Sequence, residues 1–161
     1  MQRQLNIGGD MQKFMRDVQF SCRDNSRTPM QWDNSNFAGF SSSKPWLDIN
    51  QNYKNINAAA QENDANSCLN YFRKMVQLRK STPAFVYGAY EILDRQNPNI
   101  YAYIRTMNGK SFLVLLNFKI TIDTFNSKLD LRKATLKLNN YGTANKDAKQ
   151  LRPYEAAIYE L

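Results

Sequence analysis

NIYAYIRTMNGKSFLVLLNF, at residues 99–118, predicts a β-hairpin. Apolar and polar side chains alternate over residues 99–107, as in a strand that buries one face. Asn108-Gly109 follows, and this dipeptide favours a two-residue hairpin turn. Residues 110–118 are almost continuously apolar, which indicates a strand buried on both faces.

Outward from this hairpin, the sequence predicts four more strands, at residues 86–93, 120–125, 134–138 and 156–161. They recur at roughly regular spacing with turn residues between them, which is typical of an antiparallel sandwich or a small barrel. We therefore expect residues 84–161 to form a C-terminal antiparallel β-sandwich domain, in a chain that is mainly β with helices.

Two helices are expected before Pro83. Apolar residues recur at nearly helical spacing over residues 10–20 and again over residues 67–80, where Ser67 can cap the first turn. Pro83 then ends the second helix. Residues 21–66 follow neither a helical nor a strand period, and an irregular segment of this length normally signals function or an absent scaffold.

The composition excludes several kinds of site. The 161 residues include no histidine, which rules out Ser-His-Asp and Cys-His catalysis and histidine-ligated zinc. Cys22 and Cys68 are too far apart in the sequence to supply the close pairs of a zinc site. Two free cysteines in a reducing compartment are the expected state, with one long-range disulfide as the alternative. We expect neither a metal nor a cofactor.

The net charge of +8 raises the question of nucleic acid. The charge is spread evenly, because residues 1–83 and residues 84–161 each carry 11 Lys/Arg and 7 Asp/Glu. This even distribution argues against a basic binding arm, so no nucleic-acid partner is expected. No run of about 18 apolar residues predicts a membrane span, and the first residues lack the pattern of a signal peptide. The expected location is the cytoplasm.

The polar string RDNSRTPMQW at residues 23–32 is the most specific segment of the chain. It sets Arg23 and Arg27 beside Asp24 and Asn25, ahead of a proline-fixed turn. An arginine can direct paired hydrogen bonds to sugar hydroxyls or to a carboxylate. From the residues alone, a self-bonded loop in which Asp24 accepts from Arg27 is the favoured interpretation, and a loop that contacts a ligand is the alternative.

This string resembles a signature of the α-amylase superfamily, glycoside hydrolase family 13, and is most similar to its oligo-1,6-glucosidase, α-glucosidase and sucrose-isomerase branch. The resemblance continues in order to the end of the chain, with Phe37 and Gln51 standing where the family usually has asparagine and proline. The similar segments are AGF at 38–40, KPW at 44–46, NQNY at 50–53, IN at 56–57, LNYFRKM at 69–75 and LRPYEA at 151–156.

The resemblance implies a retaining mechanism on a (β/α)8 barrel, with two catalytic carboxylates and a third aspartate upstream of this segment. Residues 1–83 are then expected to be the end of that catalytic barrel, comprising the loop after strand 8 and helix 8. Residues 84–161 would be the C-terminal sandwich. The chain is expected to be the C-terminal portion of an enzyme acting on short α-linked glucose oligosaccharides, with no catalytic residue of its own and no activity alone.

One pocket residue is implied by the resemblance. The position of Arg23 lines the sugar pocket in these enzymes, where it pairs with an aspartate from early in the barrel and helps to hold the non-reducing-end sugar. Asp24, Asn25 and Arg27 are expected to brace the loop. Asp24 lies between two arginines that favour its ionised form, so it is a poor general acid.

The aromatic residues are expected to pack rather than to bind sugar. Trp32 and Trp46 are expected in a core. Four tyrosines of the predicted sandwich are expected to pack it against the barrel or the last helix, with a carbohydrate-stacking platform as the alternative. These tyrosines are Tyr87, Tyr90, Tyr101 and Tyr103.

Separation from the barrel has a consequence for association. The loop at residues 21–66 and the helix at residues 67–80 would normally pack on the missing (β/α)8 barrel, so their apolar sides are expected to be exposed or to form a homodimer. Two other functions remain as alternatives. A free-standing carbohydrate-binding sandwich would release heat with isomaltose or maltose, and a basic nucleic-acid-binding protein would bind DNA with a steep salt dependence.

Overall fold

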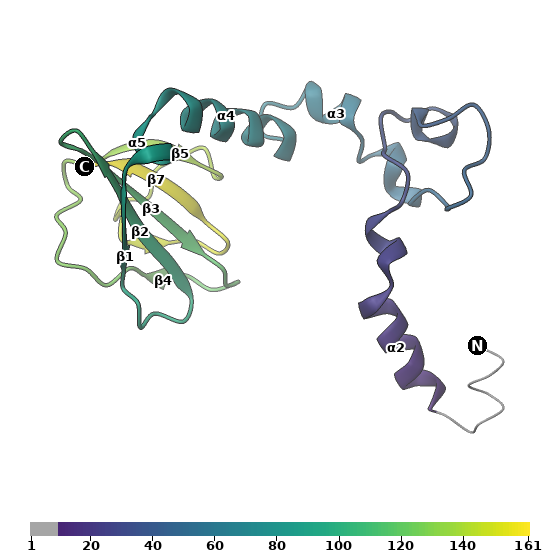
Figure 1. Ribbon diagram of the computed structural model, residues 1–161, viewed down its shortest axis with the longest axis horizontal. Helices are drawn as coiled ribbons and strands as arrows, with labels where there is room; N and C mark the ends of the chain where they lie inside the picture. The colour runs from purple at the N-terminus through teal and green to yellow at the C-terminus, as the bar shows by residue number, and fades with distance from the viewer. Residues whose placement is uncertain (1–9) are drawn as a thin grey trace. The chain divides into compact units, whose positions relative to one another are not determined.

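The computed structural model describes residues 10–161, apart from the side chain of Asn25. The chain divides into two compact units, Met1–Asn63 and Asp64–Leu161. In the described part of the chain, helices come first, up to Tyr87, and antiparallel strands follow from Ala89, as the ribbon shows (Figure 1). The two compact units therefore meet at residues 63 and 64. The expected boundary at residue 83, between the barrel segment and the C-terminal sandwich, stays a prediction.

The first unit consists of short elements joined by irregular backbone. Within residues 10–63, the longest helix is α2 (Met11–Ser21). Asp10 is its N-cap, and the Asp10 carboxylate accepts from the backbone N–H of Gln12 at 2.9 Å and of Lys13 at 3.1 Å. This confirms the helix expected at residues 10–20. The remaining elements are η1 (Arg23–Ser26), η2 (Asn36–Gly39), η3 (Gln51–Lys54) and α3 (Ala58–Glu62).

The second unit opens with two helices. In α4 (Cys68–Ser81), the Ser67 hydroxyl caps the first turn by accepting from the backbone N–H of Asn70 at 3.2 Å. Pro83 ends this helix as expected, but it also serves as the N-cap of α5 (Ala84–Tyr87). The strand expected at 86–93 is therefore wrong over its first residues, because the backbone there closes a helical turn instead of extending.

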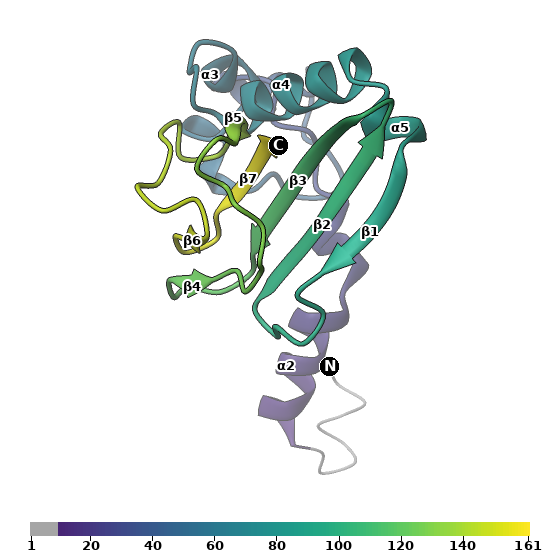
Figure 2. The ribbon, with the colours of Figure 1, turned by 90° about the vertical axis from the view of Figure 1, so that its left-hand side faces the viewer.

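A five-stranded antiparallel sheet follows, in the order β1-β2-β3-β7-β5 (Figure 2). Its central hairpin joins β2 and β3 through Asn108 and Gly109, whose φ angles of 51° and 75° are those of the expected turn. The strand bounds are β1 (Ala89–Leu93), β2 (Ile100–Met107), β3 (Lys110–Asn117), β5 (Thr135–Asn139) and β7 (Ala156–Glu160).

Strand β3 is buried on both faces, as its apolar run predicts. Leu113 and Leu115 face a core that also contains Phe125. Phe112 and Val114 belong to a second core on the other face, which Ala84 and Phe85 of α5 cover. The helix α5 thus covers one face of the sheet.

Two other expectations need correction. Residues 120–125 yield only the two-residue strand β4 (Asp123–Thr124), paired with β6 (Gln150–Leu151). With this short strand and the additional helix α5, the described chain is a mixture of helix and antiparallel sheet rather than mainly β. Within residues 10–161, no helix is both long and apolar enough to span a membrane.

Candidate functional site

The segment RDNSRTPMQW at residues 23–32 begins in a single 3-10 turn. In η1, the Ser26 hydroxyl donates to the carbonyl of Arg23 at 3.0 Å, and the backbone N–H of Arg27 donates to the carbonyl of Asp24 at 3.1 Å. These bonds use the backbone of the turn and leave the Arg23 side chain exposed. Among the described residues, no hydrogen bond or ion pair engages the Arg23 guanidinium.

The neighbouring charges pair with each other. The Arg27 guanidinium contacts the Asp24 carboxylate at 2.7 Å, and both side chains are about half exposed. This is the local pairing that the sequence allows, and the bracing role of these two residues stays a prediction. The side chain of Asn25, also expected to brace the loop, lies outside the described residues.

The end of the string is tied to the start of α3. The Gln31 amide donates to the Asn52 side chain at 3.0 Å and to the carbonyl of Ile56. Asn57 is only 5% exposed, and its side chain donates to the carbonyl of Tyr53 and accepts from the N–H of Ala60, each at 2.8 Å. Gln31 and Asn57 therefore organise the loop, and sequence analysis assigned neither of them this role.

A left-handed turn shapes the middle of the loop. Phe37, Ala38 and Gly39 have φ angles of 54°, 56° and 64° in succession. The Ala38 carbonyl accepts from the N–H of Trp32 at 2.9 Å, and Ala38 itself is fully buried. A Cβ at Gly39 would lie 2.6 Å from the Asp33 carboxylate, so the loop requires glycine there.

The carboxylates of this region accept from near neighbours in the sequence. Asp33 accepts from the hydroxyl and backbone N–H of Ser35, which lower its pKa. Asp48 pairs with Lys44 at 3.3 Å, and both are highly exposed. Asp10 and Asp24 have the helix-capping and Arg27 contacts described above. These local contacts do not produce the arrangement of glycoside hydrolysis, in which two carboxyl groups face each other across a bond.

The aromatic residues of the loop do not form a core. Trp32 is 54% exposed and Trp46 is 86% exposed, so the expectation that both are core residues is wrong for this chain. The buried residues identified between 10 and 63 are small or polar, and two of them are Ala38 and Asn57. The described part of this unit, residues 10–63, has too little apolar interior to enclose an indole.

The tyrosines of the sheet divide into two groups. Tyr103 is half-buried and packs against the core of Ala84, Phe85, Phe112 and Val114, as Leu78 of α4 also does. Tyr87, Tyr90 and Tyr101 are exposed, so packing against the last helix does not account for them. The Tyr90 and Tyr101 hydroxyls bond to each other at 2.7 Å, and the ring centres of both lie 5.4 Å from that of Tyr103.

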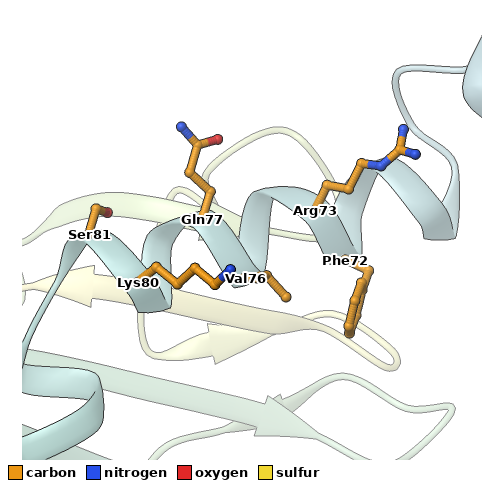
Figure 3. A pocket seen from close by; sticks show the side chains of 6 residues that line it. All are labelled: Phe72, Arg73, Val76, Gln77, Lys80 and Ser81. Atoms are coloured by element: carbon orange, nitrogen blue, oxygen red, sulfur yellow. The ribbon is translucent and has the colours of Figure 1, made fainter.

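Helix α4 also presents apolar side chains to the surface. None of its residues is buried, and Phe72 is 56% exposed. Figure 3 shows Phe72 and Val76 pointing to the same side of the helix, with Gln77 pointing away. All three residues contribute to the lining of an open hollow of about 520 Å³. The expectation that the apolar side of this helix is exposed is therefore confirmed.

Comparison with known proteins assigns the family. Residues 2–88 match the model of the α-amylase catalytic domain, which is more than half of the chain. The chain belongs to the α-amylase family. It is 37% identical to oligo-1,6-glucosidase of Bacillus cereus over 98% of its length, and 42% identical to an α-glucosidase of Pediococcus pentosaceus over 99%. It spans 29% and 28% of those relatives, respectively.

Solved structures of this α-amylase family give the same result. Isomaltulose synthase from Klebsiella sp. LX3 superimposes with a TM-score of 0.84 at 37% identity, over 99% of this chain and 29% of that enzyme. Trehalose-6-phosphate hydrolase of Bacillus licheniformis gives a TM-score of 0.88 at 29% identity, over 98% of this chain and 30% of that enzyme. The chain thus has the fold of a partial region of these glycoside hydrolase family enzymes.

Proposed function

We propose that this chain is the C-terminal portion of an α-glucosidase-type enzyme that hydrolyses short α-linked glucose oligosaccharides with retention. Residues 1–83 would be the loop after strand 8 and helix 8 of a (β/α)8 barrel, and residues 84–161 the C-terminal sandwich. The similarity to oligo-1,6-glucosidase and α-glucosidase over nearly the whole chain supports this assignment. We further propose a cytoplasmic location for the enzyme.

Arg23 is the residue that we assign to the substrate. It opens the segment RDNSRTPMQW, its side chain is exposed, and the turn that carries it is held by backbone bonds that do not use the guanidinium. A guanidinium can direct several hydrogen bonds to neighbouring hydroxyls of one sugar ring, a geometry that an ammonium group does not match. In the whole enzyme, Arg23 would hold the non-reducing-end sugar.

The reaction itself would use carboxylates outside this chain. A retaining glycosidase needs a nucleophile that forms a glycosyl-enzyme and an acid/base that first protonates the leaving oxygen and then activates water. Asp10, Asp24, Asp33 and Asp48 have the local contacts described above, which suit structural roles. We therefore propose that the chain supplies binding and support and that it is inactive alone.

A chimera tests the assignment of Arg23. This chain would replace the matching segment of Bacillus cereus oligo-1,6-glucosidase, and kcat/KM for isomaltose would be measured. Arg23→Lys should lower kcat/KM about 10- to 100-fold, since hydrogen bonds to a charged group contribute about 1.5–3 kcal/mol.

Arg27→Lys is the matched control for this chimera, because Arg27 forms an exposed local pair with Asp24. It should change kcat/KM by less than about fivefold. Equal effects of the two substitutions would contradict the assignment of Arg23 to the sugar.

A further inference from the structure

The end of the catalytic-domain match does not coincide with the division between the two compact units. The match ends at residue 88, directly before β1 begins at Ala89. The compact unit that contains the sheet nevertheless begins at Asp64. Residues 64–88, which include α4 and α5, therefore fold with the sheet even though they match the catalytic domain. The joint between α4 and the sheet is α5.

Arginines from both sides saturate the carbonyl end of α5. Arg79 of α4 donates through Nη1 to the carbonyl of Phe85 at 2.6 Å. Arg105 of β2 donates through Nε to the carbonyl of Ala84 at 3.1 Å and through Nη2 to the carbonyl of Val86 at 3.2 Å. Basic side chains can satisfy carbonyls at a helix end, and the Ala84 carbonyl also accepts from the backbone N–H of Gly88 at 3.0 Å.

These bonds lie against a close-packed joint. Ala84 and Phe85 are buried, and the Phe85 ring contacts that of Phe112 with centres 4.9 Å apart. A Cβ at Gly88 would lie 2.5 Å from the carbonyl oxygen of Ala84 and 2.8 Å from that of Thr106. The chain therefore passes from α5 to β1 with no space for a side chain, and a change in the α5 direction would disturb this packing.

We propose that Arg79 and Arg105 form a clamp that holds α4 at a fixed orientation to the sheet through α5. Arg105 bonds two carbonyls at once through its planar fork, which lysine cannot reproduce. Arg79 adds the bond from the helix side. With both arginines bonded, the sheet and α4 move as one body, and the sheet acts as a brace for α4.

Distances between two spin labels test the clamp in the full chain. One label is attached to Cys68, which is exposed at the start of α4, and the other to Lys119→Cys beyond β3, in a Cys22→Ser background. The parent protein should give one narrow distance distribution. Arg79→Met with Arg105→Met should at least double its width. Arg132→Met, which removes an exposed ion pair with Asp130, should leave it unchanged.

Hydrogen exchange on Arg105→Lys covers the case in which the double variant fails to fold. Amides of α4 and α5 should exchange at least tenfold faster while those of β3 keep their rates, because only the joint has been loosened. A folded double variant with the parental distance distribution would overturn the proposal, as would an even acceleration over helices and sheet. Neither measurement needs enzymatic activity, so its outcome is independent of the proposed function.

Discussion

Glu155 is a residue on which the second unit depends. Its side chain is almost fully buried, and one carboxylate oxygen accepts from the backbone N–H of Arg152 at 2.8 Å and from the Asn145 amide at 2.8 Å. The other oxygen accepts from the Arg152 guanidinium at 2.7 Å. The Cζ atom of this guanidinium also lies 4.0 Å from the ring centre of Tyr141. Burial acts to raise the pKa of Glu155, but the bonds from Arg152 and Asn145 outweigh it and lower the pKa.

Acid should therefore destabilise the chain through Glu155. A carboxyl whose pKa is lower in the folded state stabilises the fold at pH values above its unfolded pKa of about 4.3. This contribution is lost as the pH falls through the folded pKa. Thermal unfolding between pH 7 and pH 3 should show a decline in Tm below about pH 4.5. The Glu155→Gln variant should lack the part of this decline that protonation of Glu155 causes.

The same substitution should cost about 3 kcal/mol at pH 7, because it leaves Arg152 without its buried charged partner. Asp130→Asn serves as the control, since it breaks a pair whose arginine is 88% exposed and should cost less than about 1 kcal/mol. Identical pH profiles for the parent and Glu155→Gln would contradict the role of this carboxylate.

Gly88 offers a second residue test. Gly88→Ala should lower the free energy of unfolding by about 3 kcal/mol, because the added Cβ would overlap two backbone carbonyls. Gly109→Ala should cost only about 1 kcal/mol, since nothing lies within 4 Å of its Cβ and only its positive φ opposes the change. Urea titrations of both variants would measure the difference, and a smaller loss for Gly88→Ala would refute the steric argument.

At the scale of elements, local signals predicted the helices and the hairpin. Ser67 and Pro83 bracket α4, and Asn108-Gly109 closes β2 on β3, because each of these features acts within a few residues. The helix α5 was missed in part because one of its carbonyls, that of Ala84, accepts from Arg105, which lies 21 positions away in the sequence. The alternating pattern of residues 86–93 does not indicate the contact between Arg105 and α5.

The candidate site was only partly predictable for the same reason. The local pair of Asp24 with Arg27 follows from a spacing of three residues, and the sequence suggested it. The bond of Gln31 to Asn52 spans 21 positions, and no single-sequence pattern indicates it. The burial of Trp32 and Trp46 was mispredicted because hydrophobicity predicts a core only where the chain supplies surfaces to enclose the ring.

Across the whole molecule, the exposed apolar side of α4 has a consequence for association. Burial of Phe72 and Val76 against a second chain would remove apolar surface from water. Light scattering at high concentration should therefore give a mass of about twice the 18.7 kDa of one chain. Phe72→Glu should restore the single-chain mass. A uniform 18.7 kDa species in the parent would contradict this prediction.

The central claim is that this α-amylase family chain supports a sugar site without carrying the acids that cleave the sugar. The most direct test is the release of nitrophenol from p-nitrophenyl α-glucoside by the purified 161-residue chain, with its fold verified by circular dichroism. We predict a rate equal to that of the enzyme-free blank. Hydrolysis above the blank that follows the folded chain through purification would contradict the claim.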